Sequence, residues 1–219
     1  MIFYIISLKI KLIRDYYKYN ACIYNNNMEQ IIQNVNTIIN LYEQFGGSDY
    51  IGESQTQLEH MTRAAMLAEE FGEHTDMILA AFLHDIGHLI EINNDTIKMG
   101  SLGIMNHELI ARDYLIEKGF DENIANIVGN HVKAKRYLVT KYPEYKTNLS
   151  EASRQTLLYQ KNTMSQEEMT EFESDPLFNK SLKLRFYDDQ SKLLSKSIKP
   201  LDYYRNLMIE YLSESTNNV

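Results

Sequence analysis

The sequence predicts an all-α fold, a compact bundle of about eight or nine helices. Three observations support this prediction. Apolar residues recur at intervals of three and four along residues 28–219, which is the spacing of one helix face. The strict alternation of apolar and polar residues that is typical of strands is nearly absent. The chain has only three prolines, and glycines or capping residues mark the ends of the apolar stripes.

The first three helices have clear boundary signals. A stripe of isoleucine, valine and leucine predicts a helix over residues 28–45, which two glycines end. Thr56 and Glu59 form a capping-box pattern, which opens a second helix that extends to about residue 71. A third helix begins after the next glycine and carries residues 80–88, the stretch Ala-Ala-Phe-Leu-His-Asp-Ile-Gly-His.

The second half of the chain continues the same pattern. Residues 93–103 are polar and contain glycine, which predicts a loop. Helices are then expected over residues 105–118, 121–142, 150–160, 177–188 and 200–213, and another begins at the second capping-box pattern, residues 165–168. No internal repeat or interdomain linker is evident, so residues 28–219 are expected to form one domain.

Composition excludes several classes of protein. The formal net charge of −8 argues against binding of a nucleic-acid backbone as the main task. The single cysteine, Cys22, cannot form an intramolecular disulfide, which favours a reducing compartment and a cytoplasmic location. No window reaches the roughly 18 consecutive apolar residues of a membrane span. The expected state is therefore a monomer or homodimer that binds neither nucleic acid nor a membrane.

Residues 1–27 differ from the rest of the chain. Their apolar start precedes the first basic residues, which is the reverse of a secretory signal, and no small-residue cleavage site follows. We interpret them as an extension that the domain does not need and that is dispensable or poorly ordered. A short helix packed on the domain is the equally weighted alternative.

The pair His84-Asp85 lies in an apolar, helix-forming run. Burial of an imidazole beside a carboxylate is costly unless a hydrogen bond or a metal compensates. Neighbouring residues point about 100° apart on a helix, so the pair can converge only at the helix flank, and His88 follows one turn later. For the dipeptide alone, an ordinary buried hydrogen-bonded pair is the favoured interpretation.

The other histidines change that balance. His60, His84, His107 and His131 fall on successive predicted helices, followed by Asp188 on a later one, whereas His74 marks a helix boundary and is expected to be a cap or surface residue. Helical bundles build metal sites in this way, from side chains on facing helices. The order His60, His84-Asp85 and Asp188 resembles that of the HD-domain superfamily, most of whose members are metal-dependent phosphohydrolases.

A narrower resemblance extends over residues 28–212. The sequence is similar to the HD-domain mixed-valent diiron oxygenases that cleave organophosphonates. The matching blocks are Tyr50-Ile-Gly-Glu53, Gln57-Leu-Glu-His60, His84-Asp-Ile-Gly-His88, the ten residues from Gly129 to Leu138, Asn148-Leu-Ser-Glu-Ala-Ser153-Arg-Gln-Thr156 and Leu184-Arg185-Phe-Tyr-Asp188. The His-Asp pair alone is a weak signal, but the blocks together are specific.

This resemblance implies a site with two iron ions in a mixed-valent Fe(II)/Fe(III) pair. By position, His60, His84, Asp85 and Asp188 would hold one iron, His107 and His131 would hold the other, and Asp85 would bridge them. Neutral imidazoles and carboxylates suit iron, and an incomplete ligand set leaves room for substrate and O₂. The implied reaction splits the C–P bond of a 1-hydroxy-2-aminoethylphosphonate and gives glycine and phosphate.

The resemblance also implies the substrate contacts. Lys135, Ser153, Thr156 and Arg185 would bind the phosphonate, with His88 donating to the same oxygens. Glu53 would attract the ammonium group, and Tyr50 would cover the iron until substrate enters. Taken alone, Lys135 also suits a solvated helix face, and Ser153 suits a local backbone hydrogen bond.

Two other functions remain open. The same ligands could serve a phosphohydrolase that attacks a phosphomonoester or nucleotide with metal-activated water. A binding or sensor module that only detects a metal or an anion is the third possibility. Dependence of phosphate release on O₂ separates the oxygenase from the hydrolase.

Overall fold

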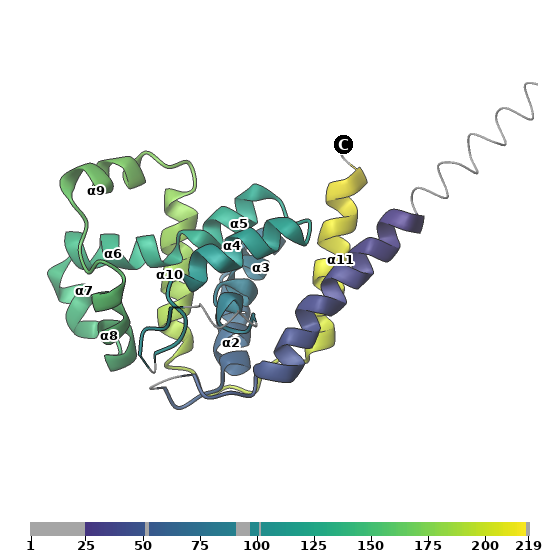
Figure 1. Ribbon diagram of the computed structural model, residues 1–219, viewed down its shortest axis with the longest axis horizontal. Coiled ribbons are helices and arrows are strands. Elements are labelled where there is room, and N and C mark those ends of the chain that lie inside the picture. Colours follow the sequence, from purple (N-terminus) through teal and green to yellow (C-terminus); the bar gives the residue numbers. More distant parts are fainter. Residues whose placement is uncertain (1–24, 51–52, 91–96, 101, 218–219) are drawn as a thin grey trace, which may run out of the picture.

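The computed structural model describes residues 25–50, 53–90, 97–100 and 102–217, and within these ranges the fold is all-α, as predicted (Figure 1). No described residue belongs to a β-strand, and the bridges Asp49–Thr56 and Lys98–Ile104 are isolated. The first described helix covers residues 25–45. It is followed by α2 (Gln57–Glu70), α3 (Thr75–Leu83), η1 (Ile86–His88), α4 (His107–Glu117), α5 (Glu122–Gly129), α6 (His131–Lys141), α7 (Pro143–Asn148), α8 (Glu151–Tyr159), α9 (Gln166–Glu173), α10 (Phe178–Ser191) and α11 (Leu201–Asn217).

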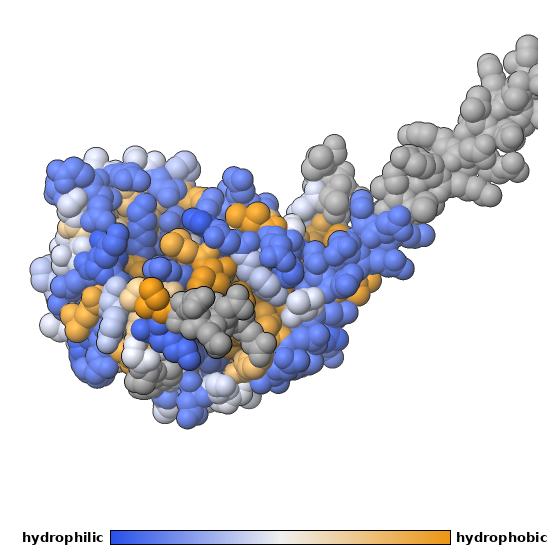
Figure 2. All heavy atoms as spheres, viewed as in Figure 1, coloured by the Kyte–Doolittle hydropathy of each residue, from blue (hydrophilic) through white to orange (hydrophobic). Residues whose placement is uncertain are grey.

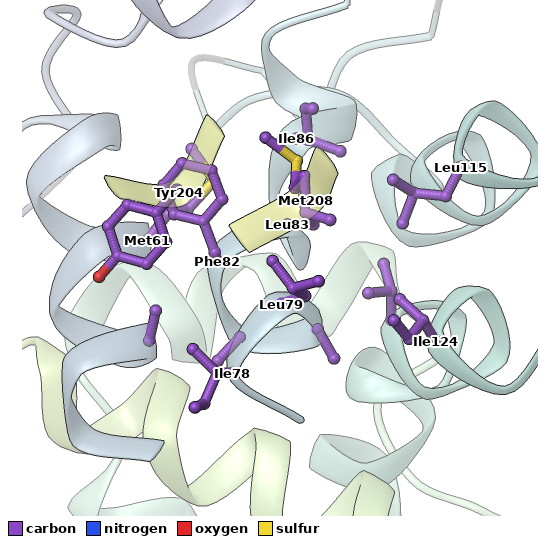
Figure 3. Packing of buried hydrophobic residues seen from close by; sticks show 14 of the residues in the cluster. Met61, Ile78, Leu79, Phe82, Leu83, Ile86, Leu115, Ile124, Tyr204 and Met208 are labelled. Carbon is purple, nitrogen blue, oxygen red and sulfur yellow. The ribbon is translucent and has the colours of Figure 1, made fainter. Parts of the chain in front are cut away.

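The core is built around α3, whose residues from Met77 to Leu83 are all buried. Helices α2, α5, α10 and α11 pack against it (Figure 3). The ring of Phe82 stacks on Tyr204 of α11 at 4.1 Å and on Tyr42 of the first helix at 4.5 Å. The Tyr42 hydroxyl donates to the Phe82 carbonyl at 2.5 Å, so its polar end is satisfied inside the core. This packing fixes the C-terminal end of α3, where the His-Asp pair lies.

The first helix and α11 lie side by side along one edge of the molecule (Figure 1), joined by an ion pair between Glu43 and Arg205 at 3.6 Å. Hydrophilic residues cover the outer side of the first helix, while hydrophobic ones gather near the middle of the same face (Figure 2). This division is what amphipathic helices around one core produce. In the part of the chain that the structure describes, no helix is both long and apolar enough to cross a lipid bilayer.

Both predicted capping boxes are confirmed. The Thr56 side chain accepts from the backbone N–H of Glu59, whose carboxylate accepts from Thr56 N, and Ser165 and Glu168 repeat the arrangement at the start of α9. The first helix already includes residue 25, so it does not begin at Met28. The proposed extension over residues 1–27 lies mostly outside the described residues.

The prediction of one helix over residues 121–142 is wrong. The chain forms two helices, α5 and α6, which meet at Asn130. The Asn130 N–H reaches back to the carbonyls of Asn126 and Ile127, while its side-chain amide donates to Asp175 at 3.2 Å. These bonds end α5 with a local cap, and the tertiary contact holds the junction. His131 is therefore the first residue of a new helix.

Three further differences concern helix ends. Helix α3 ends at Leu83, and Asp85 leaves helical geometry (φ −104°, ψ 11°) before the short η1. Pro143 opens α7, which was not expected, because proline suits the first turn of a helix. Helix α10 extends to Ser191, three residues beyond the predicted end at Asp188. The first and last of these differences directly shape the site.

Candidate metal centre

Four histidines from different parts of the chain converge in the core. His60 lies on α2, His84 ends α3, and His107 and His131 are the first residues of α4 and α6; all four are buried. They form two pairs. The Nε2 atoms of His60 and His84 are 3.1 Å apart, and those of His107 and His131 are also 3.1 Å apart.

Asp85 lies between the two pairs. Its Oδ2 is 3.5 Å from His60 Nε2 and 3.3 Å from His84 Nε2. Its Oδ1 is 3.3 Å from His107 Nε2 and 3.4 Å from His131 Nε2. Each oxygen of one carboxylate thus faces its own pair of imidazoles, which is the arrangement of a carboxylate that bridges two cations.

Hydrogen bonds at the opposite ring nitrogens define the tautomers of three of these histidines. The Nδ1–H groups of His84, His107 and His131 donate to carbonyls three residues earlier, at 2.9, 3.2 and 2.8 Å. A backbone carbonyl can only accept, so each Nδ1 carries the proton. In the neutral imidazoles that bind metal, the Nε2 atoms that face Asp85 therefore present lone pairs.

His60 has the same tautomer through a different partner. The hydroxyl of the fully buried Ser191 donates to the Asp188 carbonyl at 2.8 Å. Because its proton is used there, it accepts from His60 Nδ1–H at 2.9 Å, a shorter contact than that of the Gln55 amide nitrogen, which lies 3.3 Å from the same Nδ1. All four Nε2 atoms are thus oriented as ligands, with their outer nitrogens fixed as in metal-binding histidines generally.

This donor set fits a pair of metal ions. Two lone pairs 3.1 Å apart cannot hydrogen-bond to one another and would repel without a cation between them. Metal–ligand bonds of about 2.1 Å separate two ligands by about 3.0 Å at a right angle and by about 3.4 Å at a tetrahedral angle. The observed separations of 3.1 to 3.5 Å within each half of the site agree with these values.

Asp188 completes the half of the site that contains His60 and His84. Its Oδ1 is 3.4 Å from His60 Nε2 and 4.0 Å from His84 Nε2, and these three residues form a compact potential ligand group. In the other half, His88 lies near Asp85 and His107. We assign His131 rather than His88 to that half, because His88 Nδ1 accepts from Ile104 N and its ring stacks on His107 at 3.9 Å.

The electrostatics of the site favour cations. Burial alone would raise the pKa of Asp85, but its interactions with the surrounding imidazoles, that of His84 first, hold that pKa well below its usual value. Burial, reinforced by His107, lowers the pKa of His88 to about 3, so this ring is neutral near pH 7. The centre therefore combines ionised carboxylates with a neutral His88, whose Nδ1 accepts from Ile104 N and whose Nε2–H remains available as a donor.

A small cavity opens onto this centre. Its walls include all seven residues that sequence analysis assigned to the substrate: Tyr50, Glu53, His88, Lys135, Ser153, Thr156 and Arg185. Asp85, His107, His131 and Asp188 line the same cavity. The structure thus brings the predicted substrate residues and the predicted ligands together, although their roles stay predictions.

One wall of the cavity carries a buried cationic cluster. Lys135 Nζ donates to Thr156 Oγ1 at 3.1 Å, and Lys192 Nζ donates to Ser153 Oγ at 3.1 Å. Burial and the nearby charges of Arg185 and Lys192 lower the pKa of Lys135 to about 7. A buried ammonium in such surroundings is stabilised by an anion.

Arg185 is held more tightly than the sequence suggested. Its guanidinium donates to Asp188 Oδ2 at 2.5 Å, to Tyr145 Oη at 2.9 Å and to both oxygens of Asp189. These bonds use three of its five N–H groups, so two remain for a ligand. Arg185 is therefore first of all the counter-ion of the predicted iron ligand Asp188.

Tyr50 covers the half of the site that contains His60. Its hydroxyl donates to Asp85 Oδ2 at 3.0 Å, and its ring stacks on His60 with centroids 4.0 Å apart. Glu53 follows in the same turn, since its N–H donates to the Tyr50 carbonyl. The Oε1 atom of Glu53 is buried and has no hydrogen-bond partner among the described residues.

Sequence analysis missed Lys192 and Ser191. Lys192 Nζ is 2.9 Å from Asp188 Oδ1 and 5.9 Å from the centre of the Tyr50 ring. Ser191 holds His60, as described above. Both follow Asp188 by about one helical turn, a signal that was available but lay beyond the predicted end of that helix.

Comparison with known proteins places this site in a family. Residues 58–205 match the HD domain family. The chain is 97% identical, over 219 residues and the full length of both proteins, to "Uncharacterized protein L432" of Acanthamoeba polyphaga mimivirus.

Two more distant relatives have named activities. One is [1-hydroxy-2-(trimethylamino)ethyl]phosphonate dioxygenase (glycine-betaine-forming) of Leisingera caerulea, 36% identical over 152 residues, which cover 69% of this chain and 76% of that protein. The other is hydroxymethylphosphonate dioxygenase of Gimesia maris, 32% identical over 183 residues, which cover 84% of this chain and 90% of that protein. The chain therefore belongs to the HD-domain family, among relatives that include these phosphonate dioxygenases.

Proposed function

We propose that this protein is a diiron oxygenase that cleaves the C–P bond of a 1-hydroxy-2-aminoethylphosphonate. The observation that carries the proposal is the position of Asp85, each of whose carboxylate oxygens faces a separate pair of histidine Nε2 atoms. The two related dioxygenases support the class of reaction, since both act on a 1-hydroxyphosphonate by name. The cationic wall and the unpaired Glu53 support a zwitterionic substrate.

The proposed reaction balances without an external reductant. A substrate R–CH(OH)–PO₃H₂ and one O₂ give R–COOH and H₃PO₄. The C–P bond and the C–H bond of the reacting carbon break, and two new oxygens are shared between the carboxylic acid and phosphate. The substrate supplies all four electrons that reduce O₂. When R is an aminomethyl group, the acid is glycine.

Two irons, when bound, would supply Lewis acidity for the substrate hydroxyl and electrons for O₂ activation. His60, His84 and Asp188 would hold one iron, His107 and His131 the other, and Asp85 would bridge them. The chain's own hydrogen bonds keep every Nε2 free for this role. The ligand set therefore needs no rearrangement of its outer contacts to accept metal.

The cationic wall would bind and orient the phosphonate. Lys135 and Lys192 supply charge, and the hydroxyls of Thr156 and Ser153, which already contact these ammonium groups, supply further hydrogen bonds. The two N–H groups of Arg185 that its own hydrogen bonds leave unused would also donate to the phosphonate. Held in this way, the carbon next to phosphorus would lie beside the predicted metal ligands in the same cavity.

At the opposite end of the substrate, Glu53 would receive the ammonium group. Its buried Oε1 lacks a hydrogen-bond partner among the described residues, and an unpaired buried carboxylate oxygen is costly until a donor reaches it. Tyr50 must move when substrate binds, because its hydroxyl occupies Asp85 Oδ2. Contact of the substrate with Glu53, in the same turn as Tyr50, would couple binding to this movement.

The test is an oxygen-electrode assay of the iron-loaded protein with 1-hydroxy-2-aminoethylphosphonate. We expect O₂ uptake, phosphate and glycine in a ratio of 1:1:1. Phosphate release that proceeds equally well without O₂ would overturn the proposal and favour a phosphohydrolase. A Glu53→Gln variant should raise KM for the aminated substrate while iron content stays near normal; loss of iron instead would assign Glu53 a structural role.

A further inference from the structure

A second and larger cavity adjoins the substrate cavity. The cavity over the metal centre has a volume of about 50 Å³, whereas the neighbouring one, measured in the same way, has about 540 Å³. The two share the side chains of Glu53 and Lys192 as walls. A small head group suits the first cavity, and the second cavity lies next to it across the side chains of Glu53 and Lys192.

Apolar residues line much of the second cavity, beside polar ones that include Asn148, Asp189 and Gln190. Leu138 of α6, Leu149 before α8, and Leu182 and Phe186 of α10 line it. Helices α6, α7 and α10, which surround it, lie together at one end of the molecule (Figure 1). Phe186 is 44% exposed, so a large aromatic side chain remains partly open to solvent at this cavity. Apolar surface of this kind is stabilised when an apolar group covers it.

The two shared residues differ in how far their polar groups are already used. Lys192 is paired with Asp188 and bonded to Ser153, whereas Glu53 Oε1 has no hydrogen-bond partner among the described residues and would receive the ammonium group. The phosphonate would then lie towards Lys135, which lines the first cavity and is not among the residues that line the second. A substituent on the nitrogen therefore passes Glu53 and enters the apolar cavity. The charge of Glu53 suits an amine that stays protonated after substitution.

We propose that the second cavity binds an apolar substituent on the substrate nitrogen. The preferred substrate is then a 1-hydroxy-2-aminoethylphosphonate whose amine carries a group larger than methyl, and the product is an N-substituted glycine. This inference rests on the proposed function for the reaction, but the binding of the substituent can be measured without turnover.

The experiment is calorimetric titration of the iron-loaded protein, without O₂, with the parent aminophosphonate and with its N-benzyl derivative. We expect the N-benzyl compound to bind at least tenfold more tightly. In an Asn148→Trp variant, a large ring enters this cavity from an exposed position on its wall, and the N-benzyl compound should lose at least tenfold in affinity. Leu158→Trp, at a position that is 68% exposed on α8 and does not line the cavity, is the matched control and should change neither affinity.

The outcomes separate the two proposals. N-benzyl binding no tighter than that of the parent, or unaffected by Asn148→Trp, would overturn the assignment of the second cavity even if the parent is turned over. Tighter N-benzyl binding that Asn148→Trp abolishes would support the assignment even if neither compound consumes O₂, a result that would overturn the proposed reaction alone.

Discussion

Replacement of Arg185 by methionine tests whether this residue mainly stabilises Asp188. Arg185 is 2% exposed and is bonded to Asp188, Asp189 and Tyr145. Methionine approximates its volume but removes the cation, so two carboxylates lose their common partner. Interactions with the same two aspartates outweigh burial and keep the pKa of Arg185 well above its usual value, which indicates a strongly coupled buried group.

The expected cost follows from the burial of the pair. Removing one partner of a buried ion pair typically costs about 3–5 kcal/mol, because the remaining charge is left uncompensated. Lys192 Nζ stays 2.9 Å from Asp188 Oδ1, which places the expected loss near the lower end of that range. For a chain of 219 residues, a loss of about 3 kcal/mol corresponds to roughly 6–12 °C in Tm.

The assay is thermal unfolding of the metal-free and the metal-loaded protein. The loss should be smaller in the loaded protein, because a bound cation also neutralises Asp188. Arg154→Met is the matched control: Arg154 pairs with Glu151 on the surface, with 40% of its side chain exposed, and should cost less than about 1 kcal/mol. If Arg185→Met lowers Tm no more than this control, the assignment of Arg185 as a buried counter-ion is refuted.

Three further predictions follow from the site. Burial and two neighbouring cations lower the pKa of Lys135 to about 7. Phosphate affinity that depends on its ammonium form is therefore present below that pH and falls as pH rises, by up to about tenfold per unit between pH 8 and 9. Titration calorimetry should show this slope, and a Lys135→Arg variant that keeps the slope would contradict the prediction. Metal analysis should find about one ion fewer per chain in His107→Ala and loss of both ions in Asp85→Ala, since Asp85 faces both halves of the site; equal losses in the two variants would argue against a bridging role. In Gly87→Ala the added Cβ would lie 2.0 Å from the His107 carbonyl oxygen. This clash should lower the free energy of unfolding in urea by about 1–3 kcal/mol and reduce metal content. The control Gly47→Ala, with open space around the added Cβ, should stay close to wild type.

Much of the fold follows from local signals in the sequence. The capping boxes, the glycine stops and the apolar stripes define helix positions through interactions within a few residues, and these are the parts that sequence analysis predicts well. The order of the histidines along the helices likewise indicates a shared site, because a bundle brings successive helices together. The substrate residues that sequence analysis assigns by resemblance to the HD-domain oxygenases all line one cavity in the structure.

The remaining features depend on contacts between distant segments. The sequence has no glycine or proline at the end of α3 at Leu83, since the first glycine after it is Gly87. The helix ends because η1 must approach α4, where Gly87 lies directly against the His107 carbonyl. The same long-range contact turns Asp85 out of helical geometry so that its two oxygens face different histidine pairs. The junction at Asn130 is similar, since Asp175, 45 residues later, helps to hold it.

The net charge of −8 conceals how charge is distributed around the cavity. On one side, Asp85 and Asp188 face four unprotonated imidazole nitrogens and would be neutralised by metal ions. On the other side, Lys192 is already paired with Asp188, but the buried ammonium group of Lys135 forms no ion pair among the described residues and would be neutralised by an anion. Neither half is electrostatically complete alone, because buried charges need partners. A ligand that is anionic at one end and coordinates metal through a neighbouring hydroxyl would satisfy both halves at once, which is the physical reason that we propose a 1-hydroxyphosphonate rather than a simple anion or a neutral alcohol as the substrate.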